Sequence, residues 1–116
     1  MLVDRADRVG ASWSSRYDRL KLNTGRQFSH LPGRPFPHGT PLFPTRDDVV
    51  DHLERHAHEV GIDILLNTAV TRIDRSHGGW RLTTSNGDLN ASQVVVATGY
   101  LQSWLSTTFA AAATMW

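Results

Sequence analysis

The chain of 116 residues contains no cysteine. This absence excludes disulfides, thiolate metal sites and a disulfide-reductase mechanism within the chain, so electron transfer would need a bound cofactor. The sequence also lacks an apolar run of ~18 residues and an N-terminal signal pattern, and the expected compartment is therefore the cytoplasm.

The chain also has almost no excess of positive over negative charge. Twelve Lys and Arg oppose eleven Asp and Glu, for a net charge of +1, and they form no basic block or aromatic-interleaved basic stripe. Nucleic acid is not an expected partner. The composition fits a single globular domain.

The most informative stretch runs from Gln93 to Tyr100, as Gln-Val-Val-Val-Ala-Thr-Gly-Tyr. Three successive β-branched residues without polar alternation predict a strand buried on both faces of a parallel sheet. The small residues that follow leave the backbone accessible at the carboxyl edge, where open α/β sheets bind ligands. An ordinary buried strand before a glycine turn would have the same sequence.

The chain opens with the apolar residues Met1, Leu2 and Val3, which we interpret as the end of another strand. Asp4 follows at the position where nucleotide-binding βαβ units accept hydrogen bonds from a ribose. A solvated Asp at a strand end is the alternative.

Residues 11–28 have no clean periodicity and are expected to form loop and extended chain. Residues 30–44 contain five prolines and two glycines, so neither a helix nor a ladder can continue through them. A long irregular connection of this kind is often a binding loop.

Thr45 to Val60 is the clearest helix. Thr45 and Asp48 have the spacing of a capping box, and Gly61 suits the C-terminal cap. We expect one apolar face of this helix to pack on the sheet. His52 and His56 lie one turn apart, but no further ligand completes a set, so we expect packed or solvated histidines and no metal site.

After the helix, Ile62 to Leu66 predicts the next parallel strand. The pattern then alternates in Val70 to Asp74 and in Trp80 to Thr84, with turn residues at 76–79 and at Asn86-Gly87. With Leu89 to Ser92, these segments predict a three-stranded antiparallel meander inserted into a parallel α/β sheet.

Five segments carry most of the recognisable short motifs: Asp4 to Trp13, Arg16 to Thr24, Pro35-Phe36-Pro37, Phe43 to Asp47 and Val94 to Tyr100. In order and spacing, they resemble the FAD domain of flavin-containing monooxygenases. The resemblance covers residues 1–100 and implies a partial Rossmann-like FAD/NAD(P)-binding domain, with residues 101–116 as a divergent tail.

The resemblance also implies roles for individual residues. Asp4, beside Arg5, matches the acid that holds the adenosine ribose, and Gly10 and Trp13 match a Gly-Gly-x-Trp stretch beside the FAD, with Ala11 replacing the second glycine. Asn23, the implied catalytic residue, and Thr24 match a segment at the reactive edge of the flavin, where an amide can hydrogen-bond a polar group on the ring. The remaining implied contacts are Val70 at the adenine and Ala97, Thr98 and Gly99 in the turn over the dinucleotide.

The sequence departs from the family pattern in one further respect. The Gly-x-Gly-x-x-Gly fingerprint, which would precede Asp4 with the first βα unit, is absent. We therefore interpret the chain as an internal piece of a larger enzyme, and we expect the isolated chain to be inactive.

The resemblance implies an FAD- and NADPH-dependent monooxygenase that inserts one oxygen atom from O2 into a small organic substrate. A Baeyer-Villiger or N-hydroxylating relative is one alternative, and a non-catalytic or binding-only fragment is another. Without the first strand of the sheet, Val94 to Val96 would present an unpaired apolar edge, and self-association through it is expected.

Overall fold

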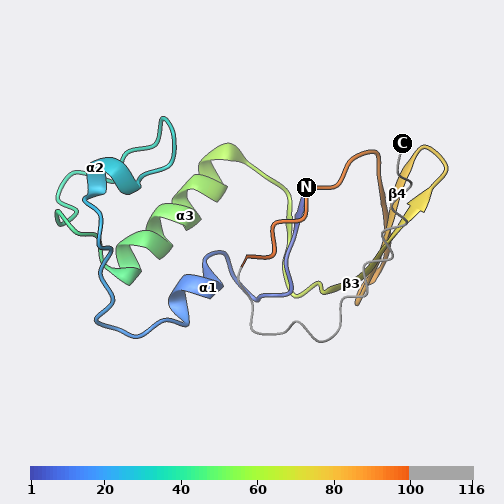
Figure 1. Cartoon of the computed structure of the whole chain (residues 1–116), viewed down its shortest axis with the longest axis horizontal. Helices are drawn as coiled ribbons and strands as arrows, with labels where there is room; N and C mark the ends of the chain where they lie inside the picture. Colours follow the sequence, from blue (N-terminus) through green and yellow to red (C-terminus); the bar gives the residue numbers. More distant parts are fainter. Residues whose placement is uncertain (100–116) are drawn as a thin grey trace, which may run out of the picture. The chain divides into compact units, whose positions relative to one another are not determined.

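A computed structural model describes residues 1–99, which divide into two compact units. The first unit comprises residues 1–2 and 6–64, and the second comprises residues 3–5 and 65–99 of the described chain. The first is built around one helix, and the second around an antiparallel meander (Figure 1).

Helix α3 spans Arg46–Val60 and confirms the prediction from the sequence. Thr45 and Asp48 form the expected capping box: the Asp48 N–H donates to the Thr45 hydroxyl (3.2 Å), and the Thr45 N–H donates to the Asp48 carboxylate (2.8 Å). Gly61 ends the helix in the left-handed conformation, with φ 64°. Within this helix Val49 and His52 are buried.

Within the first unit α3 packs against another helix, and its expected packing on a sheet stays a prediction. Its helical neighbour in the first unit is the short helix α1, Ala11–Ser14, beside which it lies in Figure 1. A second short helix, α2, spans Arg26–Ser29. Both short helices correct the prediction of loop throughout residues 11–28, because a single helical turn is too short to produce a periodic apolar pattern.

The proline-rich segment 30–44 is irregular, as predicted, and one of its rings packs against α3. Phe36 is buried, and its ring stacks on the His52 imidazole with 4.4 Å between centroids. The Arg34 guanidinium also forms an ion pair with Glu59 near the end of α3. His52 and His56 are packed side chains, and the described residues contain no cluster of three metal-ligating side chains.

Strands β1 (Leu2–Val3) and β2 (Ile64–Leu65) form a two-stranded parallel sheet. The Leu2 N–H donates to the Asp63 carbonyl (2.7 Å), and the Asp4 N–H donates to the Leu65 carbonyl (2.9 Å). Both strands are found where the sequence predicts them, although β2 is shorter than the apolar run.

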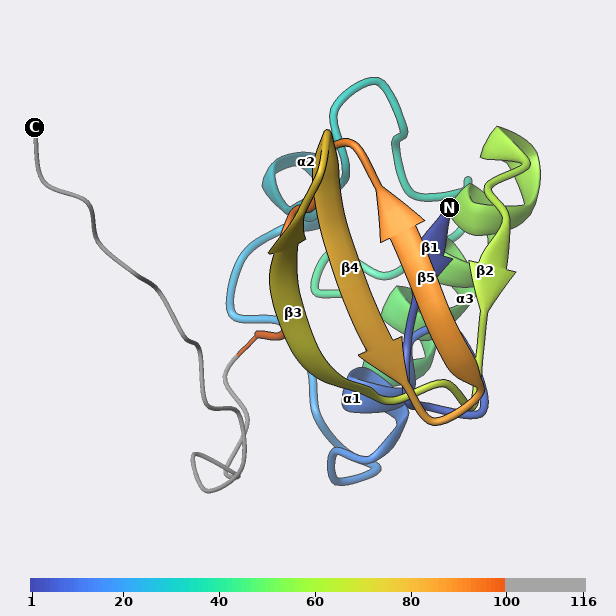
Figure 2. The ribbon, with the colours of Figure 1, turned by 90° about the vertical axis from the view of Figure 1, so that its right-hand side faces the viewer.

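The predicted meander is confirmed. Strands β3 (Val70–Ser76), β4 (Gly79–Thr84) and β5 (Gly87–Ala91) pair in sequence order and antiparallel (Figure 2). The first hairpin turns at residues 77–78, where Gly78 takes a positive φ of 81°. The second pairs Thr84 with Gly87, one residue earlier than expected.

The prediction of a buried strand at Val94 to Val96 is wrong for the described residues. No strand is assigned to residues 92–99, and Val95 and Val96 are 90% and 51% exposed. A strand of this composition is stable only between two neighbouring strands, and nothing within residues 1–99 pairs with it. No helix in the described part of the chain is long and apolar enough to cross a membrane.

Candidate functional site

Asn23 and Thr24 lie on a loop that is tied on both sides to the segment before α3. The Leu22 N–H donates to the Pro44 carbonyl (2.8 Å), and the Arg26 N–H donates to the Leu42 carbonyl (2.8 Å). The hydroxyls of Thr24 and of Ser29, the last residue of α2, are hydrogen-bonded to one another (2.5 Å). Asn23 and Thr24 are exposed, so the Asn23 amide is open to a ligand, and the backbone on either side is held by hydrogen bonds.

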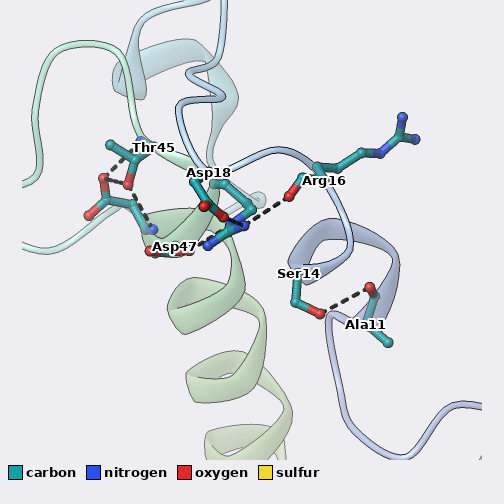
Figure 3. Close-up of polar contacts among 8 residues, drawn as sticks. Ala11, Ser14, Arg16, Asp18, Thr45 and Asp47 are labelled. Atoms are coloured by element: carbon teal, nitrogen blue, oxygen red, sulfur yellow. Dashed lines mark hydrogen bonds and ion pairs between the residues drawn. The ribbon is translucent and has the colours of Figure 1, made fainter.

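Arg46, the first residue of α3, binds the chain that precedes this loop, at Arg16 and Asp18 (Figure 3). Its guanidinium donates to the Arg16 carbonyl (2.8 Å), the Asp18 carboxylate (2.6 Å) and the Asp47 carboxylate (2.7 Å). Hydrogen bonds to Asp47 and then to Asp18 raise the pKa of Arg46 above its ordinary value. The sequence pattern did not single out Arg46, because nothing local marks which carbonyl an arginine reaches.

Gly10 and Trp13 belong to the same unit, at helix α1. Gly10 precedes the helix with φ 72°, a left-handed conformation that other residues avoid. A Cβ at Gly10 would lie 3.4 Å from Val50 Cγ1 of α3, so glycine also permits this close packing. Trp13 is half-buried, and its N–H donates to the Gly10 carbonyl (2.9 Å).

Asp4, Arg5 and Val70 belong to the second unit. Asp4 and Arg5 are exposed directly after β1, and the Asp4 carbonyl accepts a hydrogen bond from the Thr68 N–H (2.9 Å). Thr68 stands two residues before Val70, the first residue of β3. The structure therefore brings the Asp4 backbone close to the start of β3.

A small polar network fixes this junction. Thr68 is only 4% exposed, and its hydroxyl donates to the Leu66 carbonyl (3.0 Å) and accepts from the Asn86 amide (2.8 Å). Asn67 beside it takes a positive φ of 52°. Sequence reasoning found Asn86 only as a turn residue and missed Thr68, whose burial depends on a partner 18 residues away.

Ala97, Thr98 and Gly99 also belong to the second unit, and they are exposed residues outside any helix or strand. Gly99 has φ 70°, as expected for a glycine turn. The predicted site residues thus fall into two groups, one in each unit: Gly10, Trp13, Asn23 and Thr24 in the first, and Asp4, Arg5, Val70, Ala97, Thr98 and Gly99 in the second.

The chain is similar in sequence to known oxidoreductases along most of its length. A family model described as pyridine nucleotide-disulphide oxidoreductase matches residues 27–112. An uncharacterized CzcO-like oxidoreductase of Geobacillus kaustophilus is 40% identical over 101 residues, covering 87% of this chain and 29% of the relative. The probable indole-3-pyruvate monooxygenase YUCCA9 of Arabidopsis thaliana is 39% identical over 106 residues, covering 85% and 25%.

Solved structures share the fold. A flavin-containing monooxygenase from Stenotrophomonas maltophilia superimposes with a TM-score of 0.64 at 22% identity, covering 70% of this chain and 25% of that one. The S-allyl-L-cysteine S-oxygenase of Allium sativum gives 0.59 at 26% identity, covering 67% and 21%. The chain thus spans between a fifth and a third of the length of these proteins. The resemblance to flavin-containing monooxygenases is confirmed, and the chain belongs to the pyridine nucleotide-disulphide oxidoreductase family.

Proposed function

We propose that the chain forms part of the FAD-binding domain of an FAD- and NADPH-dependent monooxygenase, which inserts one oxygen atom from O2 into a small organic substrate. The observation that carries the proposal is the similarity to the probable indole-3-pyruvate monooxygenase YUCCA9, which covers 85% of this chain at 39% identity. The absence of cysteine agrees with it, because the disulphide chemistry in the family's description cannot occur in this chain.

The exposed polar groups fit FAD in their chemistry. The Asp4 carboxylate follows a parallel strand, where it can accept hydrogen bonds from both ribose hydroxyls. The Asn23 amide and Thr24 hydroxyl offer donors and acceptors for a flavin ring edge. Gly10 is explained by its backbone conformation and by Val50, so its lack of a side chain is no independent argument for the cofactor.

FAD, when bound, would accept hydride from NADPH and react with O2, and the chain would supply binding and orientation. Asp4 would anchor the adenosine end, and Val70, with the turn 97–99, would contribute backbone beside it. Asn23 would hold the reacting edge of the flavin by its side-chain amide. The rigid backbone on both sides of Asn23 favours this role, since a group that orients a ring must itself be fixed.

The test is a chimera in which residues 1–99 replace the equivalent part of the Geobacillus kaustophilus relative, so that the rest of the enzyme is present. Asp4→Ala should weaken FAD retention by about 1.5–3 kcal/mol, the value of hydrogen bonds to a charged group. Asp7→Ala removes an exposed carboxylate three residues further on and should leave FAD affinity unchanged. Equal FAD affinities of the two variants would refute the role of Asp4.

Asn23→Ala should retain FAD but raise the hydrogen peroxide released per NADPH oxidised, because the flavin edge loses its hydrogen bond. Gln27→Ala, an exposed amide on α2, is the matched control and should leave the ratio unchanged. An unchanged ratio in Asn23→Ala would show that the role belongs to another residue. A panel of ketones, amines and sulfides would separate Baeyer-Villiger and N-hydroxylating activity from other oxygenation.

A binding-only role of the chain by itself is the second candidate. It concerns the 116 residues alone, which contain no Gly-x-Gly-x-x-Gly stretch that could bind a pyrophosphate at a helix N-terminus. The purified chain of 116 residues should then be colourless and should not oxidise NADPH. A yellow preparation with near-stoichiometric FAD would contradict this expectation.

A further inference from the structure

Arg46 occupies a position that an arginine should not favour. It is the first residue of α3, where the helix dipole is positive and a cation is destabilising. Lys and Arg are normally placed in the last turn of a helix and acidic residues in the first, as Asp47 and Asp48 are here. A residue that opposes this local rule is expected to serve something outside the helix.

The contacts of Arg46 show what it serves. Its side chain is only 17% exposed, and it joins the Arg16 carbonyl and the Asp18 carboxylate, 30 and 28 residues away (Figure 3). Its backbone N–H donates to the Leu20 carbonyl (3.0 Å). One residue therefore holds the connection 16–20 at three points.

This connection leads directly to Asn23. Lys21 forms an antiparallel β-bridge with Thr45, and the Leu22 N–H donates to the Pro44 carbonyl. Asn23 is the next residue. Resting on the function proposed above, we propose that Arg46 is a positioning residue: by anchoring residues 16–20 to the start of α3, it sets the place of Asn23 and Thr24 at the flavin edge.

The alternative is an ordinary surface ion pair with a general effect on stability. Asp18 is 91% exposed, and ion pairs of exposed carboxylates contribute little to the global free energy of unfolding. The side-chain bond to the Arg16 carbonyl, in contrast, fixes the backbone of the connection, and it is lost in Arg46→Met while the backbone bond to Leu20 remains. Loss of Arg46 should therefore loosen this connection while α3 and the meander remain folded.

Amide hydrogen exchange in the chain of 116 residues tests the proposal. In Arg46→Met, the Leu22 amide should exchange at least about tenfold faster, and the amides in the middle of α3 should be unchanged. Arg55→Met, the same substitution at an exposed position of α3, should leave Leu22 at the wild-type rate. Leu22 exchange within about twofold of wild type in Arg46→Met would overturn the proposal.

Two further variants keep the test decisive if Arg46→Met folds poorly. Asp18→Ala leaves α3 intact and should accelerate Leu22 exchange by a smaller factor, and the double variant should show less than the product of the two effects. Arg46→Lys keeps the charge but loses the planar fork, so it should restore Leu22 protection only in part. Full restoration by lysine would support anchoring through charge alone, whereas equal Leu22 exchange in Arg46→Met and Arg55→Met would overturn the anchoring.

The chimera separates this inference from the proposed function. Arg46→Met should there raise peroxide release as Asn23→Ala does, with FAD affinity retained. A loosened loop with unchanged coupling would refute the flavin-edge role of Asn23, and with it the proposed function of this loop, while the anchoring by Arg46 stands. Changed coupling without a loosened loop would refute the positioning role.

Discussion

The capping box of α3 offers the most direct test of how the first unit is held together. Thr45 and Asp48 exchange hydrogen bonds between side chain and backbone, and the two side chains also share a bond of 2.7 Å. Thr45→Val removes the hydroxyl at nearly constant volume, and Asp48→Ala removes the carboxylate. Thr45→Val leaves the Asp48 N–H without its partner, and Asp48→Ala leaves the Thr45 N–H without its partner.

The expected losses follow from these contacts. Thr45→Val should lower the free energy of unfolding by about 1 kcal/mol, the usual value of a helix cap. Asp48→Ala should cost about 1 kcal/mol for its hydrogen bonds and ~0.3–1 kcal/mol for the lost interaction with the helix dipole. Because the two residues serve one another, the double variant should cost about 1 kcal/mol less than the sum of the single variants.

Urea unfolding, followed by the helical circular dichroism of the chain, measures these differences. Thr45→Ser keeps the cap oxygen and should lie within about 0.5 kcal/mol of wild type. Strictly additive losses, or a Thr45→Val variant as stable as wild type, would refute the energetic importance of the box. A changed dependence on urea concentration would show instead that the unfolded or native state itself had altered.

Three other outcomes are expected. Burial lowers the pKa of His52, so the unfolded chain binds this proton more readily, and the free energy of unfolding should fall as the pH drops through about 6.5. Urea unfolding from pH 8 to 5 measures this dependence. His52→Gln should make it weaker, whereas His58→Gln, at an exposed position of the same helix, should not. Gly10→Ala should cost about 1–2 kcal/mol of unfolding free energy, because its φ of 72° strains any other residue, and an unchanged midpoint in the same assay would contradict this. Replacing the exposed Val95 and Val96 by threonine should reduce self-association in sedimentation velocity, because these apolar side chains are open to a second chain, whereas equal association of both chains would exclude this segment as the contact.

Local signals account for what the sequence predicted correctly. The capping box at Thr45, the glycine that ends α3 and the alternating strands all depend on residues a few positions apart, and the structure confirms each of them, with the second hairpin turn one residue earlier than predicted. The family assignment came from ordered short motifs, and the comparisons confirm it. The individual roles of Asp4 and Asn23 stay predictions until the variants are measured.

Tertiary structure alone decided the rest, because it depends on partners far apart in the chain. Val94 to Val96 has the composition of a buried strand, yet composition cannot supply neighbours, and Val95 is exposed. From the sequence, Arg46 is only a charged residue at the start of a helix. The folded chain brings its guanidinium to the carbonyl of Arg16, 30 residues earlier. The sequence alone thus determined helix, meander and family, whereas the long-range hydrogen bonds that hold the loop before Asn23 became visible only in three dimensions.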